Sequence, residues 1–236
     1  MQNLTLLALD TSTEACSVAL FHRGEKTHIN ELAQRTHTKR ILPMIDEILA
    51  NSGLGLNQVD ALAFGRGPGS FTGVRVGAGI AQGLAFGADL PVIPISNLTA
   101  MAQAAFELHQ AENVVAAIDA RMNEVYFSQV VREKVRSDFA EFFQWREVIS
   151  EQVCSPEKAI SQLQNDNAFR VGTGWAAYSQ FTEKNLTGSN IELPNALYML
   201  ELARVEYLQK RTISALEIEP IYLRNEVTWK KLPGRE

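Results

Sequence analysis

Two stretches of this sequence share one layout: residues 6–21, LLALDTSTEACSVALF, and residues 115–130, VAAIDARMNEVYFSQV. In each, an apolar run ends in an aspartate (Asp10 or Asp119), a short polar turn follows, and a second β-rich run begins. A strand, an aspartate and a turn often occur together, so chance similarity is the alternative. The repeat predicts an α/β chain made of two duplicated halves, residues 1–110 and 111–236, each a sheet with helices.

The pattern of apolar residues, caps and turn residues along the chain predicts the individual elements. Thr36 or Thr38 is suited to start one helix and Gly53 to end it, while Ser70 and Ser96 are suited to cap two others. The predicted strands are 4–10, 16–21, 26–33, 59–64 and 91–95, followed in the second half by a strand in the run FRVGTGW at 169–175. The predicted helices are 36–52, 71–88, 96–109, one after Pro156, and 196–209, and a run at 217–224 closes the chain.

Composition limits the classes of function. A chain of 236 residues with 46% hydrophobic residues is long enough to bury a large core. The formal net charge of -5 argues against a nucleic-acid-binding surface that acts alone. Cys16 and Cys154 lack metal-ligand spacing and no export signal opens the chain, so we expect packed thiols and a cytoplasmic protein. Residues 71–88 are apolar but too rich in glycine for a membrane span.

Residues 65–77, GRGPGSFTGVRVG, resemble a phosphate-binding loop but are not a Walker motif, because the stretch contains no lysine. The glycines suit a tight turn from strand to helix. The helix predicted beyond it holds five glycines in 18 residues, which cost about 5 kcal/mol in helix propensity relative to alanine. Close approach of another helix would offset that cost. The helix is therefore either core within a monomer or partly covered by a partner chain.

Five segments together resemble the bacterial TsaB (YeaZ) family: LALDTSTEACSVALF, the glycine loop with its helix, IDARMNEVY, VGTGW, and PIYLRNEVTWKKLPG. The similarity covers essentially the whole chain and is weak only at residues 133–169 and 182–190. It implies the fold of actin, sugar kinases and heat-shock ATPases, with two duplicated subdomains that each have a mixed sheet flanked by helices. The C-terminal segment is expected to pack back on the N-terminal half.

The resemblance also implies a function. TsaB is a non-catalytic subunit that binds the related catalytic subunit TsaD and acts with the small ATPase TsaE. Together they transfer threonylcarbamoyl from threonylcarbamoyl-AMP to N6 of the adenosine beside the anticodon of tRNAs that read codons beginning with A. The resemblance implies a homodimer when the chain is alone, and contact with tRNA only through the complex.

The family's partner contact lies on two helices, which here correspond to the helix at 36–52 and the glycine-rich helix. The predicted interface residues are Ile41, Leu42, Ile45, Ile48, Leu49, Phe71, Gly73, Val74, Gly77, Ala78, Ala81 and Gly83. From this set we predict that replacing Gly77 or Gly83 by leucine blocks partner binding and leaves a folded monomer.

A catalytic centre is not expected. The catalytic relative binds its metal through a His-x-x-x-His pair, and the matching positions here are Asn97 and Met101. An amide and a thioether are weak ligands for a metal that polarises an oxygen, so no metal is predicted. A free-standing ATPase or kinase of the same fold remains one alternative function. A peptidase is another, although no nucleophile and base with recognisable motifs occur.

A nucleotide cleft is the remaining open question. In this fold Asp10, Thr11 and Ser12 would form the first phosphate turn, Asp119 the second, and Gly172 and Gly174 would lie near the adenosine. The alternative is that both aspartates merely accept turn hydrogen bonds at the ends of strands. Neither turn is rich in glycine, so we expect a cleft that has lost its function and no required cofactor.

Overall fold

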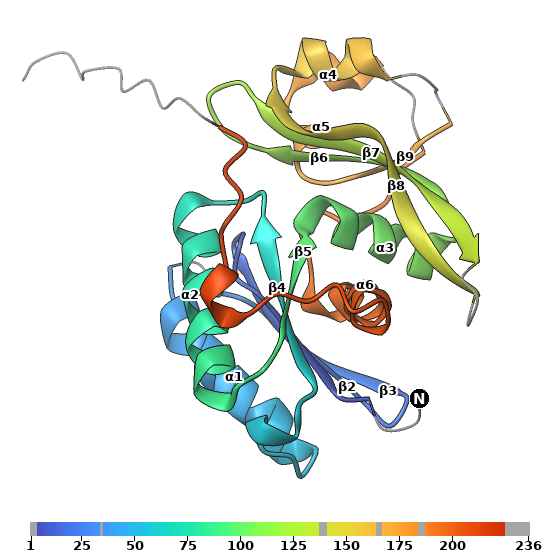
Figure 1. Ribbon diagram of the computed structural model, residues 1–236. Helices are drawn as coiled ribbons and strands as arrows, with labels where there is room; N and C mark the ends of the chain where they lie inside the picture. The colour runs from blue at the N-terminus through green and yellow to red at the C-terminus, as the bar shows by residue number, and fades with distance from the viewer. Residues whose placement is uncertain (1–3, 34, 137–140, 164–166, 184–186, 225–236) are drawn as a thin grey trace, which may run out of the picture.

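The computed structural model describes residues 4–33, 35–136, 141–163, 167–183 and 187–224 (Figure 1). The first half contains β1 (Leu6–Asp10), β2 (Ala15–His22), β3 (Glu25–Leu32), α1 (His37–Asn51), β4 (Ala61–Gly67), α2 (Phe71–Ala88), β5 (Val92–Ser96) and α3 (Asn97–His109). The second contains β6 (Asn113–Asp119), β7 (Val125–Arg136), β8 (Glu141–Cys154), α4 (Pro156–Gln162), β9 (Phe169–Val171), α5 (Gly174–Ala177) and α6 (Ala196–Leu208). Short 3-10 helices are η1 (Leu56–Gln58), η2 (Ser179–Glu183) and η3 (Ala215–Glu217).

The two sheets repeat one topology. Their strand orders are β3-β2-β1-β4-β5 and β8-β7-β6-β9. In the first sheet β1 is antiparallel to β2 and parallel to β4, and in the second β6 is antiparallel to β7 and parallel to β9. An antiparallel meander, a helix and a parallel return strand therefore occur twice. This confirms the predicted fold class of two duplicated subdomains, each with a mixed sheet and helices.

Both faces of the first sheet are covered, which explains the unbroken apolar run of β1. Leu7 and Leu9 point into the core beneath α1 and α2, whereas Leu6 and Ala8 point into the core beneath α6. The alternation follows from the two-residue period of a strand. Figure 1 shows α1 and α2 on one side of this sheet and α6 on the other, so the C-terminal helix packs on the N-terminal half.

The second sheet is covered in the same manner. Val115 and Ala117 lie in a core with residues of α4 and α5, while Val114 and Ala116 pack with residues of α3. Helix α3 also contacts α6, and it lies between the second sheet and α6 in Figure 1. Helix α3 is therefore the element shared by the two halves.

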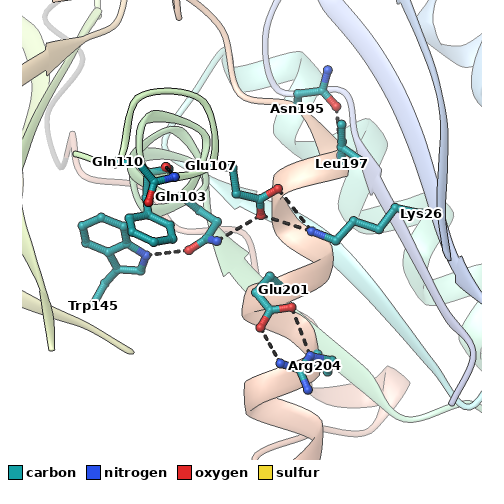
Figure 2. Close-up of polar contacts among 10 residues, drawn as sticks. Lys26, Gln103, Glu107, Gln110, Trp145, Asn195, Leu197, Glu201 and Arg204 are labelled. Carbon is teal, nitrogen blue, oxygen red and sulfur yellow. Dashed lines mark hydrogen bonds and ion pairs between the residues drawn. The ribbon is translucent and has the colours of Figure 1, made fainter. Parts of the chain in front are cut away.

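A chain of polar contacts crosses α3 (Figure 2). The indole N–H of Trp145 donates to Gln103 Oε1 at 2.9 Å, and Gln103 Nε2 donates to Glu107 Oε1 at 3.0 Å. Lys26 Nζ donates to both carboxylate oxygens of Glu107, at 3.1 and 3.2 Å. These contacts join β8, α3 and β3, and so tie the second sheet to the edge of the first.

The observed elements begin and end within one or two residues of the predicted ones in most cases. Ser70 and Ser96 cap α2 and α3 through their side chains, as predicted, and Gly53 follows the end of α1 with a φ of +66°. Thr36 holds the N-cap position of α1 without a capping hydrogen bond from its side chain. The β7–β8 hairpin extends much further than the β-rich run at 125–130.

Candidate functional site

The candidate site begins at the turn after β1, which lies directly beneath the glycine loop. Thr11 Oγ1 donates to the carbonyl of Gly73 at 2.7 Å, and the N–H of Ser70 donates to the carbonyl of Ser12 at 2.7 Å. A Cβ atom at Gly69 would lie 2.5 Å from the carbonyl oxygen of Ser12, and one at Gly73 would lie 2.2 Å from that of Thr11. The glycines are therefore needed for contact with the chain's own first turn.

Asp10 is held in the interior of this turn. Its Oδ2 accepts the N–H of Ser12 at 3.3 Å and the hydroxyl of Ser12 at 3.0 Å, and Asn97 Nδ2 approaches its Oδ1 at 3.4 Å. Burial raises the pKa of Asp10 to about 7, although the hydrogen bonds from Ser12 and Asn97 act in the opposite direction. This carboxyl group is therefore largely neutral at slightly acidic pH.

The second turn, which follows β6, is more exposed, and its aspartate is bonded to other side chains. The carboxylate of Asp119 accepts from the backbone N–H of Arg121 at 2.8 Å, from its guanidinium at 2.9 Å, and from the hydroxyl of Tyr178 at 2.7 Å. Burial and the bond to Asp119 raise the pKa of Tyr178 to about 12. Gly172 has a φ of +105°, and a Cβ there would lie 2.1 Å from the carbonyl oxygen of Ala117.

These groups do not fit a magnesium nucleotide. A phosphate needs free N–H or hydroxyl donors, and a metal needs an ionised carboxylate. In the first turn the hydroxyl of Thr11 and the N–H and hydroxyl of Ser12 are all bonded within the chain, while Asp10 is buried. In the second turn Asp119 is paired with Arg121. The residues predicted for the cleft instead hold the chain's own turns and glycine loops together.

The positions that match the metal ligands of the catalytic relative lie in the interior. Asn97 and Met101 on α3 are both fully buried, Asn97 against the first turn and Met101 in the core beneath the second sheet. Within the part of the chain that the structure describes, no three histidine, cysteine or acidic side chains are grouped to hold a metal ion. Among the same residues, no helix is both long enough and apolar enough to span a membrane.

Helix α2 has two different glycine faces. Gly73 and Gly77 lie on the buried face with Val74, Ala78, Ala81 and Ala85. On the opposite side, a Cβ atom at Gly79, Gly83 or Gly87 would meet nothing within 4 Å, and Phe86 is 71% exposed. We call Gly79, Gly83, Phe86 and Gly87 the open face of α2. Next to the open face, Phe86 also lines a groove of about 730 Å³, whose other side is formed by residues 212–216.

The structure changes the predicted interface. Most of the predicted residues face the chain's own core, because the apolar side of each helix packs on the first sheet. The buried members are Ile41, Ile45, Ile48, Leu49, Gly73, Val74, Gly77, Ala78 and Ala81. Leu42, Phe71 and Gly83 remain accessible from outside. The expectation that Gly77→Leu leaves a folded monomer stays a prediction, and a Cβ at Gly77 would lie 2.9 Å from Thr11 Oγ1, so leucine there would also disturb the chain's own first turn.

The predicted set of interface residues left out three members of the open face: Gly79, Phe86 and Gly87. A signal was present, because small residues at 79, 83 and 87 follow each other at helical spacing. A second stripe at 73, 77 and 81 gives the same signal. Spacing alone does not say which of the two stripes the sheet covers.

Comparisons with known proteins give one consistent result. The family model described as TsaD, tRNA N6-adenosine threonylcarbamoyltransferase, matches residues 26–230. The tRNA threonylcarbamoyladenosine biosynthesis protein TsaB of Haemophilus influenzae is 96% identical over the full length of both chains. The protein of that name from Escherichia coli K12 is 46% identical over 99% of this chain and all of its own. The solved structure of YeaZ from Pseudomonas aeruginosa is 41% identical, with a TM-score of 0.84 over 93% of this chain and 100% of its own.

Proposed function

The chain belongs to the TsaB (YeaZ) family of tRNA threonylcarbamoyladenosine biosynthesis proteins, and from that premise we propose that it is a non-catalytic subunit of the modifying complex. It binds a TsaD-like catalytic subunit and acts with a TsaE-like ATPase. The complex transfers threonylcarbamoyl from threonylcarbamoyl-AMP to N6 of the adenosine beside the anticodon. The tRNA substrate is held by the assembled complex in the cytoplasm, and no nucleotide bound to this chain is required.

One observation carries the non-catalytic assignment: the region that would hold a metal and a nucleotide in a catalytic member serves here as internal packing. Asn97 Nδ2 donates to Ser12 Oγ and to the carbonyl of Pro68, and Met101 packs in the core beneath the second sheet. A catalytic group must be within reach of the reacting atoms. Buried groups that are already bonded to one another do not meet this requirement.

The open face of α2 supports the assignment of a partner. Glycines on an exposed helix surface destabilise the helix by roughly 1 kcal/mol each relative to alanine and gain nothing inside the monomer. They allow another helix to approach closely. Phe86 offers a large apolar side chain beside them, and an exposed aromatic of this kind is typical of an interface centre.

The test is an omission experiment. The TsaD-like subunit, the TsaE-like ATPase, ATP, threonylcarbamoyl-AMP and unmodified tRNA are combined with and without this chain, and the modified nucleoside is measured by mass spectrometry. We expect repeated modification only when the chain is present. Equal modification without it would contradict the proposed function.

Gly83→Leu is the variant that tests the surface. A Cβ atom at this position would meet nothing within 4 Å and Gly83 is exposed, so the variant should fold with equal or slightly higher stability. It should nevertheless lose binding to the TsaD-like subunit, by at least tenfold, and lose modification in parallel. Ser161→Leu on the exposed side of α4 is the matched control and should bind normally. Normal binding by Gly83→Leu would exclude the open face as the contact.

A further inference from the structure

Two side-chain oxygens lie in the interior beside Gly65. A Cβ atom at Gly65 would lie 2.0 Å from Asp10 Oδ1 and 2.6 Å from Asn97 Oδ1, so both oxygens lie against the same glycine. Asp10 and Asn97 are almost completely buried, and Asn97 Oδ1 has no hydrogen-bond partner. Asn97 Oδ1 is therefore a buried acceptor without a donor, while the adjacent Asp10 Oδ1 has only the 3.4 Å contact from Asn97 Nδ2.

The orientation of the Asn97 amide is set by its other contacts. Its Nδ2 donates to the Pro68 carbonyl at 3.3 Å, and it donates to Ser12 Oγ. The Ser12 hydroxyl uses its own proton on Asp10 Oδ2 and is therefore an acceptor toward Asn97. Reversing the amide would place its oxygen against the Pro68 carbonyl. The nitrogen therefore stays on that side, and the oxygen stays on the side of Asp10.

We propose that Asp10 is a neutral carboxylic acid in the folded chain, and that its Oδ1 proton is donated to Asn97 Oδ1. The bond satisfies both oxygens with a single proton. Ionised Asp10 would instead place a buried charge opposite a lone pair, with only the long contact to Asn97 Nδ2 on that oxygen. The raised pKa of Asp10 agrees with this arrangement.

The surroundings contribute no compensating positive charge in the part of the chain that is described. The influences on Asp10 are burial, Ser12 and Asn97. On β2, Ser17 lies opposite Asp10, and the neighbouring Cys16 is neutral because burial, followed by the charge of Asp10, raises its pKa to about 11. On β4, Gly65 has no side chain, and the guanidinium of Arg66 is paired with Glu151.

The proton on Asp10 would stabilise the contacts that hold the start of α2 against the turn after β1. Asn97 Nδ2 donates to the carbonyl of Pro68 in the glycine loop, and the carbonyl of Ser12 accepts from the N–H of Ser70, the cap of α2. Loss of the proton would set Asp10 against Asn97 and loosen residues 65–73 from the first turn. The structure thus contains a pH-sensitive contact between β1, α3 and the start of α2. The inference does not depend on the proposed function.

The direct test is ¹³C NMR of the aspartate carboxyl carbons in the wild-type chain between pH 5 and pH 9. We expect the Asp10 signal to have the chemical shift of a protonated acid at pH 5 and to titrate near 7. Hydrogen exchange of residues 65–73, corrected for the intrinsic effect of pH, should become faster above that pH. An Asp10 carboxylate already ionised at pH 5 would overturn the proposal, because the Asn97 amide would then be reversed.

Asp10→Asn gives an independent test by stability. Below about pH 4, Asp10 is protonated in both the folded and the unfolded chain, and above about 7 it is ionised in both. Between these values only the unfolded chain releases the proton. Stability therefore falls as pH rises, by roughly tenfold in the unfolding equilibrium constant per pH unit.

The asparagine keeps the shape and supplies an N–H to Asn97 Oδ1 at every pH, so it should remove this part of the pH dependence. Asp46→Asn on the exposed side of α1 is the control and should follow the wild type. Parallel curves for Asp10→Asn and the wild type between pH 4 and 7 would overturn the proposal.

Discussion

At the scale of single residues, the same amino acid has two different functions along α2. Gly73 is required by contact, since its Cα lies against the backbone of the turn after β1. Gly79 faces outward and meets nothing inside the chain. Helix propensity assigns both the same cost, so only the three-dimensional surroundings separate a glycine that holds the fold from one that leaves room for a partner.

Alanine substitutions at these two glycines should have effects of opposite sign. In Gly73→Ala the new methyl group lies 2.2 Å from the Thr11 carbonyl oxygen, a backbone atom that cannot turn away. We expect a loss of about 2–3 kcal/mol of stability, in the range of other overpacked sites. Gly79→Ala should gain about 1 kcal/mol, because alanine is the better helix former. Urea unfolding of both variants measures the difference.

A stable Gly73→Ala chain would show that the glycine loop moves easily away from the first turn. Such a result would also weaken the link between Asp10 and the start of α2. A destabilised Gly79→Ala chain would show that the open face is covered within the monomer.

At the scale of elements, what could be predicted depends on whether the signal is local. The caps at Ser70 and Ser96 are local, since a serine hydroxyl needs only the N–H three residues later, and both were predicted. The outer part of the β7–β8 hairpin was not predicted. Its strands carry charged residues on both faces, for example Arg132, Glu133 and Arg146, so no apolar alternation marks them.

The β7–β8 hairpin also makes a cation–π contact with α3, which is distant in sequence and so is not predicted by any sequence pattern. The Arg132 guanidinium lies 3.5 Å from the ring centre of Phe106 on α3 and 3.6 Å from that of Phe143 on β8. The Arg132 side chain is only 13% exposed, and it also pairs with Glu112 at 3.7 Å. The contact joins the hairpin to α3.

Arg132→Gln should therefore lower stability by about 1–2 kcal/mol, because a neutral amide loses both ring contacts. Arg146→Gln is the matched control: its guanidinium is 54% exposed and pairs with Glu133, so the loss should stay below about 1 kcal/mol. Denaturant unfolding gives both values. If the two variants lose the same small amount, the stacked guanidinium does not hold the hairpin.

At the scale of the whole molecule, the sequence pattern predicted the duplication, whereas the return of the C-terminal segment to the first half was expected only from the family resemblance. The repeat at Asp10 and Asp119 is visible in the sequence and predicted one sheet in each half, but the strand orders of the two sheets were not predicted. Helix α6 follows the second sheet in sequence, yet Ala196, Met199 and Leu200 lie in the core of the first sheet. An apolar stripe shows that a helix has a buried side but does not identify the sheet that buries it.

In addition to the contacts that run from Trp145 to Lys26 across α3, two further polar links span the halves. Arg66 on β4 donates to Glu151 on β8 at 3.0 Å, and the hydroxyl of Ser96 donates to the same carboxylate. The C-terminal segment forms the other link, which is visible in Figure 1 as the chain rising from η3 past α2 toward the second sheet. There the N–H of Ile221 donates to the carbonyl of Arg66, and Arg224 donates to Glu124 at 3.1 Å.

These links should fix the angle between the halves, because folds of two subdomains around a cleft otherwise bend at the connection. Spin labels at Ala50→Cys on α1 and Ser161→Cys on α4 report the distance, and both sites are exposed. Glu151→Gln and Arg224→Gln together should broaden the distance distribution measured by pulsed EPR, and each alone should broaden it less. Arg211→Gln removes a guanidinium whose partner Glu206 lies on the same stretch of chain, so it should change nothing. An unchanged distribution in the double variant would mean that the packing of α3 and α6, together with the contacts from Trp145 to Lys26, sets the angle without these two links.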